Sequence, residues 1–300
     1  MLYMSFFTGI KAPSAPIFMV ISALSFALMS AAVKQADQIP FIQKVFFRNF
    51  VMGILVIPVL FLKMRSSGSA RLFFGASANR KRLLIRSLFG FFGVMLYFYS
   101  VERLHLGDSA MLNKLSAFFV IILSAVFLNE RIRRYQVPAL FAAFAGAVLI
   151  VKPGMNMQIV PAAAGLCAAL LAAAAYTIIA SLRGREDSLT IIFWFSAISV
   201  LMSLIPMILV WTTPNAAELT ALILTGVFAA GGQYFLTLAY THGPAGEVSI
   251  YNYTHVVFSV IIGFILWREI PDLFSFVGAV LIIGAAVFLY LKRKRNFNEV

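Results

Sequence analysis

Charged residues and cysteine are both scarce in this chain of 300 residues. Charged side chains make up 12% of it, whereas soluble domains carry about 25%. Acidic residues are the scarcer kind, with 11 Asp and Glu against 24 Lys and Arg. The single cysteine, Cys167, excludes an intramolecular disulfide and a cysteine-based zinc cluster. The composition therefore excludes an ordinary soluble domain, and we expect no metal and no other cofactor.

Apolar residues take the place of the missing charges and amount to 62% of the chain. They form ten runs, at 14–33, 42–62, 83–101, 108–128, 135–151, 161–182, 189–211, 219–241, 246–267 and 273–291. A helix of about 20 residues crosses the hydrocarbon core of a bilayer, where the backbone must satisfy its own hydrogen bonds. The sequence predicts an all-α membrane protein with ten transmembrane helices.

Basic residues gather in the loops on one side of the predicted spans. With both termini in the cytoplasm, the inner side receives most of them, including those of 63–86, 131–134, 183–185 and 292–300. Lys44 and Arg48 fall on the outer side. Because cytoplasmic loops are enriched in Lys and Arg, we expect a multi-pass protein of the inner (cytoplasmic) membrane with a retained first span and a basic cytoplasmic tail. The net charge of +13 then needs no nucleic acid, and we expect the basic loop after span two to contact anionic lipid.

A constant shift of 139 residues relates the second group of five runs to the first over residues 89–130, with no gap. The identical pairs between residues 89 and 130 are Phe89/Phe228, Gly93/Gly232, Gly107/Gly246, Asn113/Asn252, Phe119/Phe258, Ile122/Ile261 and Glu130/Glu269. Polar and glycine pairs carry weight, since such residues are costly or structurally special in a span. We predict two five-helix repeats, 14–151 and 161–291. Because five is odd, the repeats have inverted topology, which is common in secondary transporters.

Short motifs recur near the ends of the predicted spans. They are Leu104 to Ala110, Leu128 to Arg131, Gly146, Trp267 to Glu269, Gly278 and Gly284. These motifs resemble the EamA-type drug/metabolite transporter superfamily. The resemblance implies a ten-span inverted-repeat carrier, a substrate bound between spans one, three, four, six, eight and nine, and a structural role for Glu130 and Glu269. Many relatives have a proline early in spans four and nine. Ser116 and His255 lie in that neighbourhood here, so we expect no proline kink.

Lys114 is a charged residue inside the fourth predicted span. A charge at the centre of a bilayer costs about 2.5–3.5 kcal/mol on insertion scales, so it needs a partner. We predict that Lys114 faces a central cavity and pairs with a carboxylate or phosphate of the substrate. The alternatives are an ion pair with Asp108 or Glu247, and a side chain that extends to the outer interface.

Asn113 and Asn252 occupy equivalent positions in the two repeats, and His255 lies three residues beyond Asn252. The two amides are predicted to contact one substrate, with hydrogen bonding between helices as the alternative. Histidine titrates at about pH 6.5, so His255 is a candidate for proton coupling. A packed, neutral histidine is the alternative interpretation.

Other polar and aromatic residues lie in apolar surroundings and are candidates for the cavity lining. They are Gln233, Tyr234, Tyr176, Tyr97 and Trp194. Aromatic rings can stack on a planar substrate or hold a cation over their faces. Contact with lipid or the membrane interface is the alternative for each of them.

These features predict a secondary active transporter that moves a small polar or amphipathic metabolite by alternating access. The metabolite is amino-acid-like if Lys114 meets a carboxylate. The alternatives are a channel or lipid scramblase and, less favoured, an intramembrane enzyme. One lysine supplies no ring of charge for a channel. The sequence has no phosphate-binding glycine loop, HExxH, GxSxG or paired intramembrane carboxylates, so we expect no enzyme.

Overall fold

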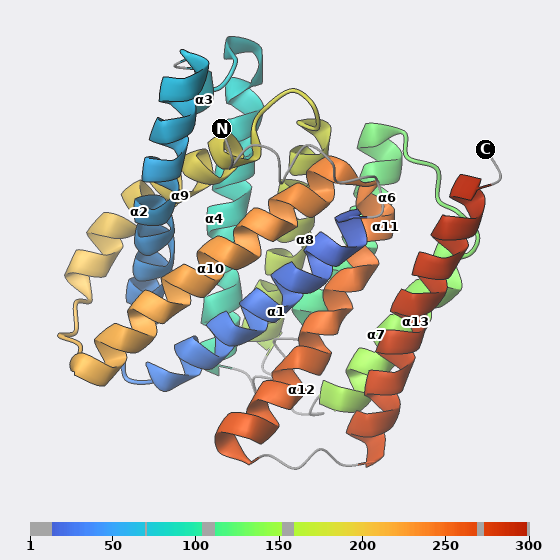
Figure 1. Cartoon of the computed structure of the whole chain (residues 1–300). Helices are drawn as coiled ribbons and strands as arrows, with labels where there is room; N and C mark the ends of the chain where they lie inside the picture. Colours follow the sequence, from blue (N-terminus) through green and yellow to red (C-terminus); the bar gives the residue numbers. More distant parts are fainter. Residues whose placement is uncertain (1–13, 70, 104–111, 152–158, 269–272, 299–300) are drawn as a thin grey trace.

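The computed structural model describes residues 14–69, 71–103, 112–151, 159–268 and 273–298. Within these ranges the chain forms helices joined by turns, with no strand (Figure 1). The prediction of an all-α protein is confirmed.

The helices fall into two halves of the chain. The first half contains α1 (Ser14–Gln35), α2 (Phe41–Ser67), α3 (Arg71–Phe74), the 3-10 turn η1 (Ser77–Asn79), α4 (Arg80–Arg103), α6 (Ser116–Leu128) and α7 (Gln136–Val151). The second half contains α8 (Ile159–Ser181), α9 (Ser188–Leu209), α10 (Ala216–His242), α11 (Ala245–Ile250), the 3-10 turn η2 (Tyr251–Tyr253), α12 (Thr254–Trp267) and α13 (Leu273–Asn298).

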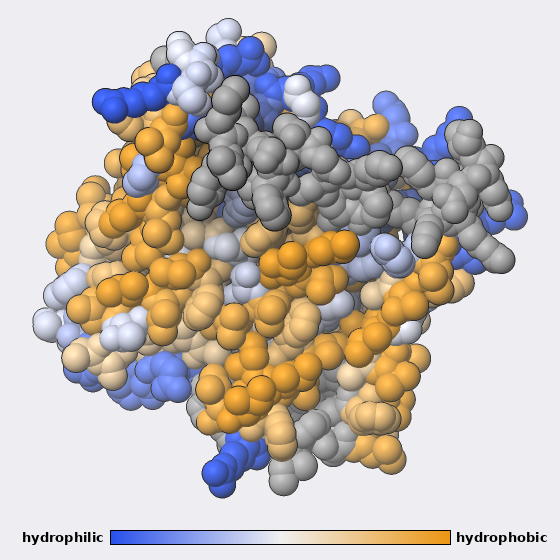
Figure 2. Space-filling model, viewed as in Figure 1, coloured by the Kyte–Doolittle hydropathy of each residue, from blue (hydrophilic) through white to orange (hydrophobic). Residues whose placement is uncertain are grey.

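Seven helical stretches are long and apolar enough to cross a membrane. They are Ala15–Gln35, Phe41–Ser67, Arg71–Ser100, Ile159–Ser181, Ser188–Leu209, Ala216–His242 and Ala245–Leu266. Shorter apolar helices at Leu112–Leu128, Gln136–Leu149 and Phe276–Lys292 occupy the places of further predicted spans. Figure 2 shows apolar residues across the middle of one face and hydrophilic residues toward its ends. The chain is thus a multi-pass membrane protein, whereas the number of ten spans stays a prediction.

The helices pack in two matching sets. α1 packs on α10 as α8 packs on α4, and α1 packs on α12 as α8 packs on α6. The pairs α2/α9 and α7/α13 lie at opposite edges of the molecule (Figure 1). The main cluster of buried apolar side chains draws residues from both halves. This arrangement is the one that two copies of a five-helix unit facing each other would give.

Two helix ends share an unusual backbone conformation. Among the residues described, Asn129 (φ 53°) and Arg268 (φ 55°) are the non-glycine residues with positive φ. Each ends a helix, and its N–H bonds to the carbonyl oxygen of Ser124 and of Gly263, respectively. The two residues are 139 positions apart, and so are the two acceptors. L-residues rarely adopt this conformation, so its recurrence at the same shift supports the repeat independently of sequence identity.

Side chains fix several helix ends. Asp187 accepts the N–H of Leu189 at the start of α9, and Asn215 and Glu218 form a capping box at the start of α10. Such caps satisfy backbone donors that have no partner inside the helix. At the opposite end of α9, the amide of Gln43 exchanges two hydrogen bonds with the backbone of Thr212, at 2.9 and 3.0 Å. Gln43 therefore joins the start of α2 to the α9–α10 loop.

The ninth predicted span is interrupted although it lacks the proline of many relatives. α11 ends at Ile250, a 3-10 turn follows, and α12 begins at Thr254. In the first half, Leu115 forms a turn between residues 112–114 and α6. Proline is therefore not required to interrupt this span. A 3-10 stretch in the middle of a helix often marks a functional hinge, and this one carries Asn252.

Gly146 allows α7 to approach α13 closely. An added Cβ would lie 2.6 Å from the carbonyl oxygen of Gly278, whereas a Cβ added at Gly284 would have no atom within 4 Å. We predict that Gly146→Ala lowers the free energy of unfolding by about 1–3 kcal/mol, because the backbone must move apart. Gly284→Ala should leave it unchanged or raise it by up to about 1 kcal/mol. SDS titration of both purified variants measures the difference, and equal effects would contradict the close approach.

Candidate functional site

A polar cavity lies where the two halves of the chain meet, with a volume of about 110 Å³. Its lining is Phe26, Met29 and Ser30 of α1, Arg48 of α2, Arg86, Gly90, Gly93, Val94, Tyr97 and Phe98 of α4, Asn113 and Lys114 before α6, Ala172, Ala175 and Tyr176 of α8, Phe195 of α9, Gln233 of α10, Asn252 of η2 and His255 of α12. α2 and α9 thus contribute to the cavity in addition to the spans that the resemblance implies.

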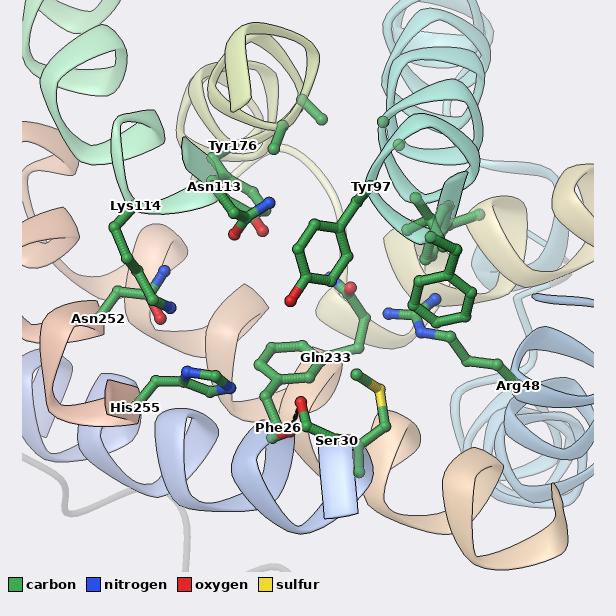
Figure 3. Close-up of a pocket in the computed structure, with 18 of the residues that line it drawn as sticks. Phe26, Ser30, Arg48, Tyr97, Asn113, Lys114, Tyr176, Gln233, Asn252 and His255 are labelled. Carbon is green, nitrogen blue, oxygen red and sulfur yellow. Dashed lines mark hydrogen bonds between the residues drawn. The ribbon is translucent and has the colours of Figure 1, made fainter. Parts of the chain in front are cut away.

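The structure brings seven of the nine predicted site residues together in this cavity. They are Lys114, Asn113, Asn252, His255, Gln233, Tyr176 and Tyr97. Figure 3 shows Lys114, Asn252 and His255 on one side of the space and Arg48 on the opposite side, with Tyr97 and Gln233 between them. The cavity therefore has a cationic group on each of two sides and neutral polar groups in its centre.

Tyr234 and Trp194 are not among the lining residues. The indole Nε1 of Trp194 donates a hydrogen bond of 3.0 Å to the carbonyl oxygen of Phe73, which ties α9 to α3. The ring of Tyr234 packs edge-on against that of Phe235, with 5.5 Å between centroids. Their contacts indicate packing roles.

Lys114 is buried, with 5% of its surface exposed, and it lines the cavity. Its ammonium has no carboxylate partner in the described part of the chain, where Glu247 instead accepts a hydrogen bond of 3.0 Å from the hydroxyl of Tyr135. The other predicted partner, Asp108, lies outside the described residues. The hydroxyl of Tyr253 donates a hydrogen bond of 3.1 Å to the backbone oxygen of Lys114, and these two residues are 139 positions apart. Equivalent positions of the two repeats thus touch beside the cavity.

His255 lies beside Lys114 on the same side of the cavity (Figure 3). The imidazole approaches the backbone oxygen of Phe26, and its Nδ1 is buried without a hydrogen-bond partner in the described structure. Asn113 and Asn252, the equivalent pair, both line the same space. Donors and acceptors from both repeats therefore converge on one volume.

Arg48 and Arg86 are lining residues that the sequence analysis missed. It assigned Arg48 to the outer side and counted Arg86 with the inner loops, whereas the structure buries both side chains in the cavity lining. Arg48 is 4% exposed and Arg86 is 1% exposed, because each lies on the inward face of a helix. A signal was present for Arg86. With Gly90, Gly93 and Tyr97 it follows helical spacing, and this row forms one face of α4.

The charged residues that line the cavity in the described part of the chain all have one sign. Three of the cavity's described lining residues, Arg48, Arg86 and Lys114, are basic, and none of the described lining residues is acidic. Buried charges normally have a partner of opposite sign, since removing an ion from water is costly. The site is therefore suited to an anionic group.

A second group of charged residues joins the two halves at another place, and we call it the Glu130 cluster: Glu130, Arg133, Tyr135, Arg183 and Glu247. The carboxylate of Glu130 accepts the backbone N–H groups of Ala245 (3.0 Å) and Gly246 (3.2 Å). These groups belong to the first turn of α11, which the helix itself leaves unpaired. Glu130 thus bonds the first half of the chain to the start of α11 in the second half, a structural role of the kind that the resemblance implies. Glu269 lies outside the described residues.

The ion pairs of the Glu130 cluster and the hydrogen bond from Tyr135 to Glu247 also cross between the halves. Arg183 lies 3.8 Å from the Glu130 carboxylate and donates to the backbone oxygen of Gly243. Arg133 lies 3.6 Å from the Glu247 carboxylate. Burial and the neighbouring Glu247 raise the pKa of the Tyr135 hydroxyl, which therefore remains a donor to that carboxylate. The cluster holds the two halves together at the end of the molecule that carries the loops at 131–135 and 183–185.

A multi-pass helical membrane protein with a polar cavity between two similar halves has the architecture of a transporter. Comparison with known proteins agrees, because the sequence matches the EamA-like transporter family over residues 13–152 and 160–291. The chain belongs to the EamA-like transporter family, as the motifs indicated.

Its relatives include proteins named as transporters of different compounds. The Pseudopaline exporter CntI of Pseudomonas aeruginosa (strain UCBPP-PA14) is 34% identical over 278 residues, which cover 92% of this chain and 95% of the relative. The S-adenosylmethionine uptake transporter of Rickettsia prowazekii (strain Madrid E) is 26% identical, over 85% and 84% of the two chains. One crystal structure superposes with a TM-score of 0.80 at 16% identity, over 94% and 98% of the chains. The names are consistent with a protein that is not an enzyme, and the superposition supports the fold.

Proposed function

We propose that this chain is a secondary active transporter of the inner membrane that carries a small, amino-acid-like metabolite. The observation behind the proposal is the cavity between the halves, in which three buried basic residues face no acidic residue among the lining residues that the structure describes. A substrate carboxylate would supply the negative counter-ion that the Lys114 ammonium lacks in the described part of the chain. Asn113 and Asn252 would hydrogen-bond its polar groups, and Tyr97 and Tyr176 would contact its apolar part.

The transport mechanism that we propose is alternating access by rocking of the halves. The repeats would be 14–151 and 161–291, with inverted topology and five spans each. The cavity lies between them, and the Glu130 cluster bonds them at one end. Opening of that end requires these contacts to separate, while contacts at the other end form.

We also propose the orientation that the basic loops favour, with both termini and the tail at 292–300 in the cytoplasm. In Figure 1, α1 begins and α13 ends toward the end of the molecule that carries α3, as this orientation requires. The basic residues near α3 would then lie at the cytoplasmic headgroups and contact anionic lipid. No nucleic acid is needed to explain them. The relatives are named for export and for uptake, so the direction of transport follows from neither name.

Substrate class is tested by thermal unfolding of the detergent-purified protein with amino acids, nucleosides and quaternary amines. A compound that binds the folded state raises the unfolding midpoint. We expect amino acids to raise the unfolding midpoint and quaternary amines to leave it unchanged, since the basic residues of the cavity repel a cationic ligand. Stabilisation by quaternary amines or nucleosides alone would refute the proposed substrate class.

Proton coupling through His255 is part of the proposal. His255 lies beside Lys114, where two positive charges would repel each other, and a substrate carboxylate between them would reduce this repulsion. Substrate and proton would therefore bind together. We predict that an inward proton gradient accelerates substrate uptake into proteoliposomes by about tenfold or less, and that His255→Gln removes the acceleration.

A matched control for this prediction is His242→Gln. His242 ends α10, and its Nδ1 lies 2.8 Å from the carbonyl oxygen of Leu238, outside the cavity lining. This variant should retain the full response to the proton gradient. An unchanged response in His255→Gln would show that His255 carries no coupling proton.

A further inference from the structure

Arg86 has an unusual environment for an arginine. It is 1% exposed, it lines the cavity, and its Nε and Nη1 atoms have no hydrogen-bond partner in the described structure. The guanidinium lies over the ring of Phe195, with Cζ 4.0 Å from the ring centroid. An aromatic face attracts a cation but accepts none of its hydrogen bonds in the plane of the guanidinium. Donors of Arg86 are therefore left for another acceptor.

Arg48 places a second guanidinium at the same ring. Its Cζ lies 5.6 Å from the Phe195 centroid, and its Nη1 donates a hydrogen bond of 3.0 Å to the side-chain oxygen of Asn49. Arg48 and Arg86 come from α2 and α4, and the neutral Asn49 balances neither charge. Two like charges in a buried site repel each other unless an anion lies near both.

Gly90 leaves the space that this arrangement of Arg86 and Phe195 needs. A Cβ at position 90 would lie 2.8 Å from Cε2 of Phe195 and 3.1 Å from Nη1 of Arg86. The absence of a side chain thus lets the ring and the guanidinium pack directly against α4. A guanidinium confined in this way is already oriented before a ligand binds, which reduces the entropy lost on binding.

The arginine pair and Lys114 occupy different sides of the cavity. Figure 3 shows Arg48 opposite Lys114, and Arg86 shares the Phe195 ring with Arg48. We propose that Arg48 and Arg86 form a second anion-binding point, so that the transported compound carries two separated carboxylates, one at each point. This inference rests on the proposed function, in which Lys114 binds the first carboxylate. It narrows the substrate class from amino-acid-like compounds to dicarboxylic ones.

Matched pairs of ligands test the second point. Aspartate, glutamate and 2-aminoadipate each have an uncharged amide of equal length, namely asparagine, glutamine and homoglutamine. Affinity is measured from the ligand-dependent unfolding midpoint of the purified full-length protein. We expect at least one acid to bind about 10- to 100-fold more tightly than its amide, the ratio that one further charged hydrogen-bonded contact supports.

Arg86→Met should abolish the preference for the acid over its amide, because it removes the guanidinium and keeps an apolar side chain of similar length. The affinity for the amides, which carry no second carboxylate, should fall less than the affinity for the acids. Arg65→Met is the matched control, since Arg65 also lies over a phenyl ring, that of Phe61 at 4.5 Å, but is exposed and outside the cavity. This control should keep the preference for the acids.

The outcomes separate the inference from the proposed function. Equal affinity for acids and amides in the native protein, or a preference that survives Arg86→Met, overturns the second point and leaves the transporter for amino acids intact. Failure of acids and amides alike to bind overturns both the second point and the proposed substrate class.

Without ligand, Arg86→Met should unfold at the same or a higher midpoint, since an unpaired buried charge is unfavourable. A lower midpoint, in Arg86→Met and in Arg86→Lys, would show a structural role for Arg86 instead.

Discussion

Lys114→Met is expected to weaken the binding of glutamine and glutamate by about 100-fold, because truncating one partner of a buried charge pair costs about 2–5 kcal/mol. The side chain is buried and has no carboxylate partner in the described part of the chain, so a bound carboxylate would be its counter-ion. Methionine retains the apolar length of lysine and removes only the charge. The loss is measured from the ligand-dependent unfolding midpoint of native and variant protein.

Lys63→Met is the matched control for this substitution. Lys63 pairs with Asp187 outside the cavity, and its side chain is 48% exposed, so we expect no change in ligand affinity. Without ligand, Lys114→Met should unfold at the same midpoint as the native protein or higher, since the buried ammonium has lost its hydration. Equal ligand affinity in the two variants would contradict the role of Lys114 in binding.

Glu130→Ala is expected to lower the free energy of unfolding by about 3 kcal/mol, the cost of leaving two buried backbone donors without their charged acceptor. The donors are the N–H groups of Ala245 and Gly246, and Arg183 loses its carboxylate neighbour as well. Because these contacts join the halves, we also expect the halves to separate more readily at this end of the molecule. The stability change is measured by SDS titration of the purified protein.

Glu218→Ala is the control for Glu130. Glu218 also accepts a backbone N–H at a helix start, from Asn215 at 2.8 Å, but it does so within one helix and at an exposed site. This variant should lose about 1 kcal/mol or less. A loss in Glu130→Ala no larger than in Glu218→Ala would contradict the assignment of Glu130 as a bond between the halves.

Hydrophobic runs predicted the helices well, because in hydrocarbon a long apolar run has few other ways to satisfy its backbone. The predicted run at 83–101 lies inside α4, and the run at 14–33 lies inside α1. Helix ends were harder to predict. α2 continues past residue 62 to Ser67, where Gly68 ends it with φ 65°, since charged residues can extend a helix beyond the membrane. The interruption at 251–253 was not predicted, because this segment lacks proline, a common cause of a kinked helix.

Polarity inside a span predicted part of the cavity, but not which way each residue faces. Gln233 lines the cavity and Tyr234 does not, since successive residues of a helix point about 100° apart. Arg48 and Arg86 were missed because counting basic residues assigns arginines near span ends to loops. Only the packing of α2, α4 and α9 shows that both guanidinium groups turn inward to Phe195.

Exchange of substrate across a liposome membrane distinguishes a carrier from a channel or scramblase. Proteoliposomes are loaded with unlabelled glutamate and diluted into a trace of labelled glutamate. A carrier whose site opens to one side at a time reorients across the membrane more readily with substrate bound than without. It therefore couples the exit of unlabelled molecules to the entry of labelled ones. We predict a transient internal accumulation of label above its equilibrium level, which Lys114→Met abolishes. Label that only equilibrates, at a rate independent of the internal glutamate, would contradict transport by alternating access.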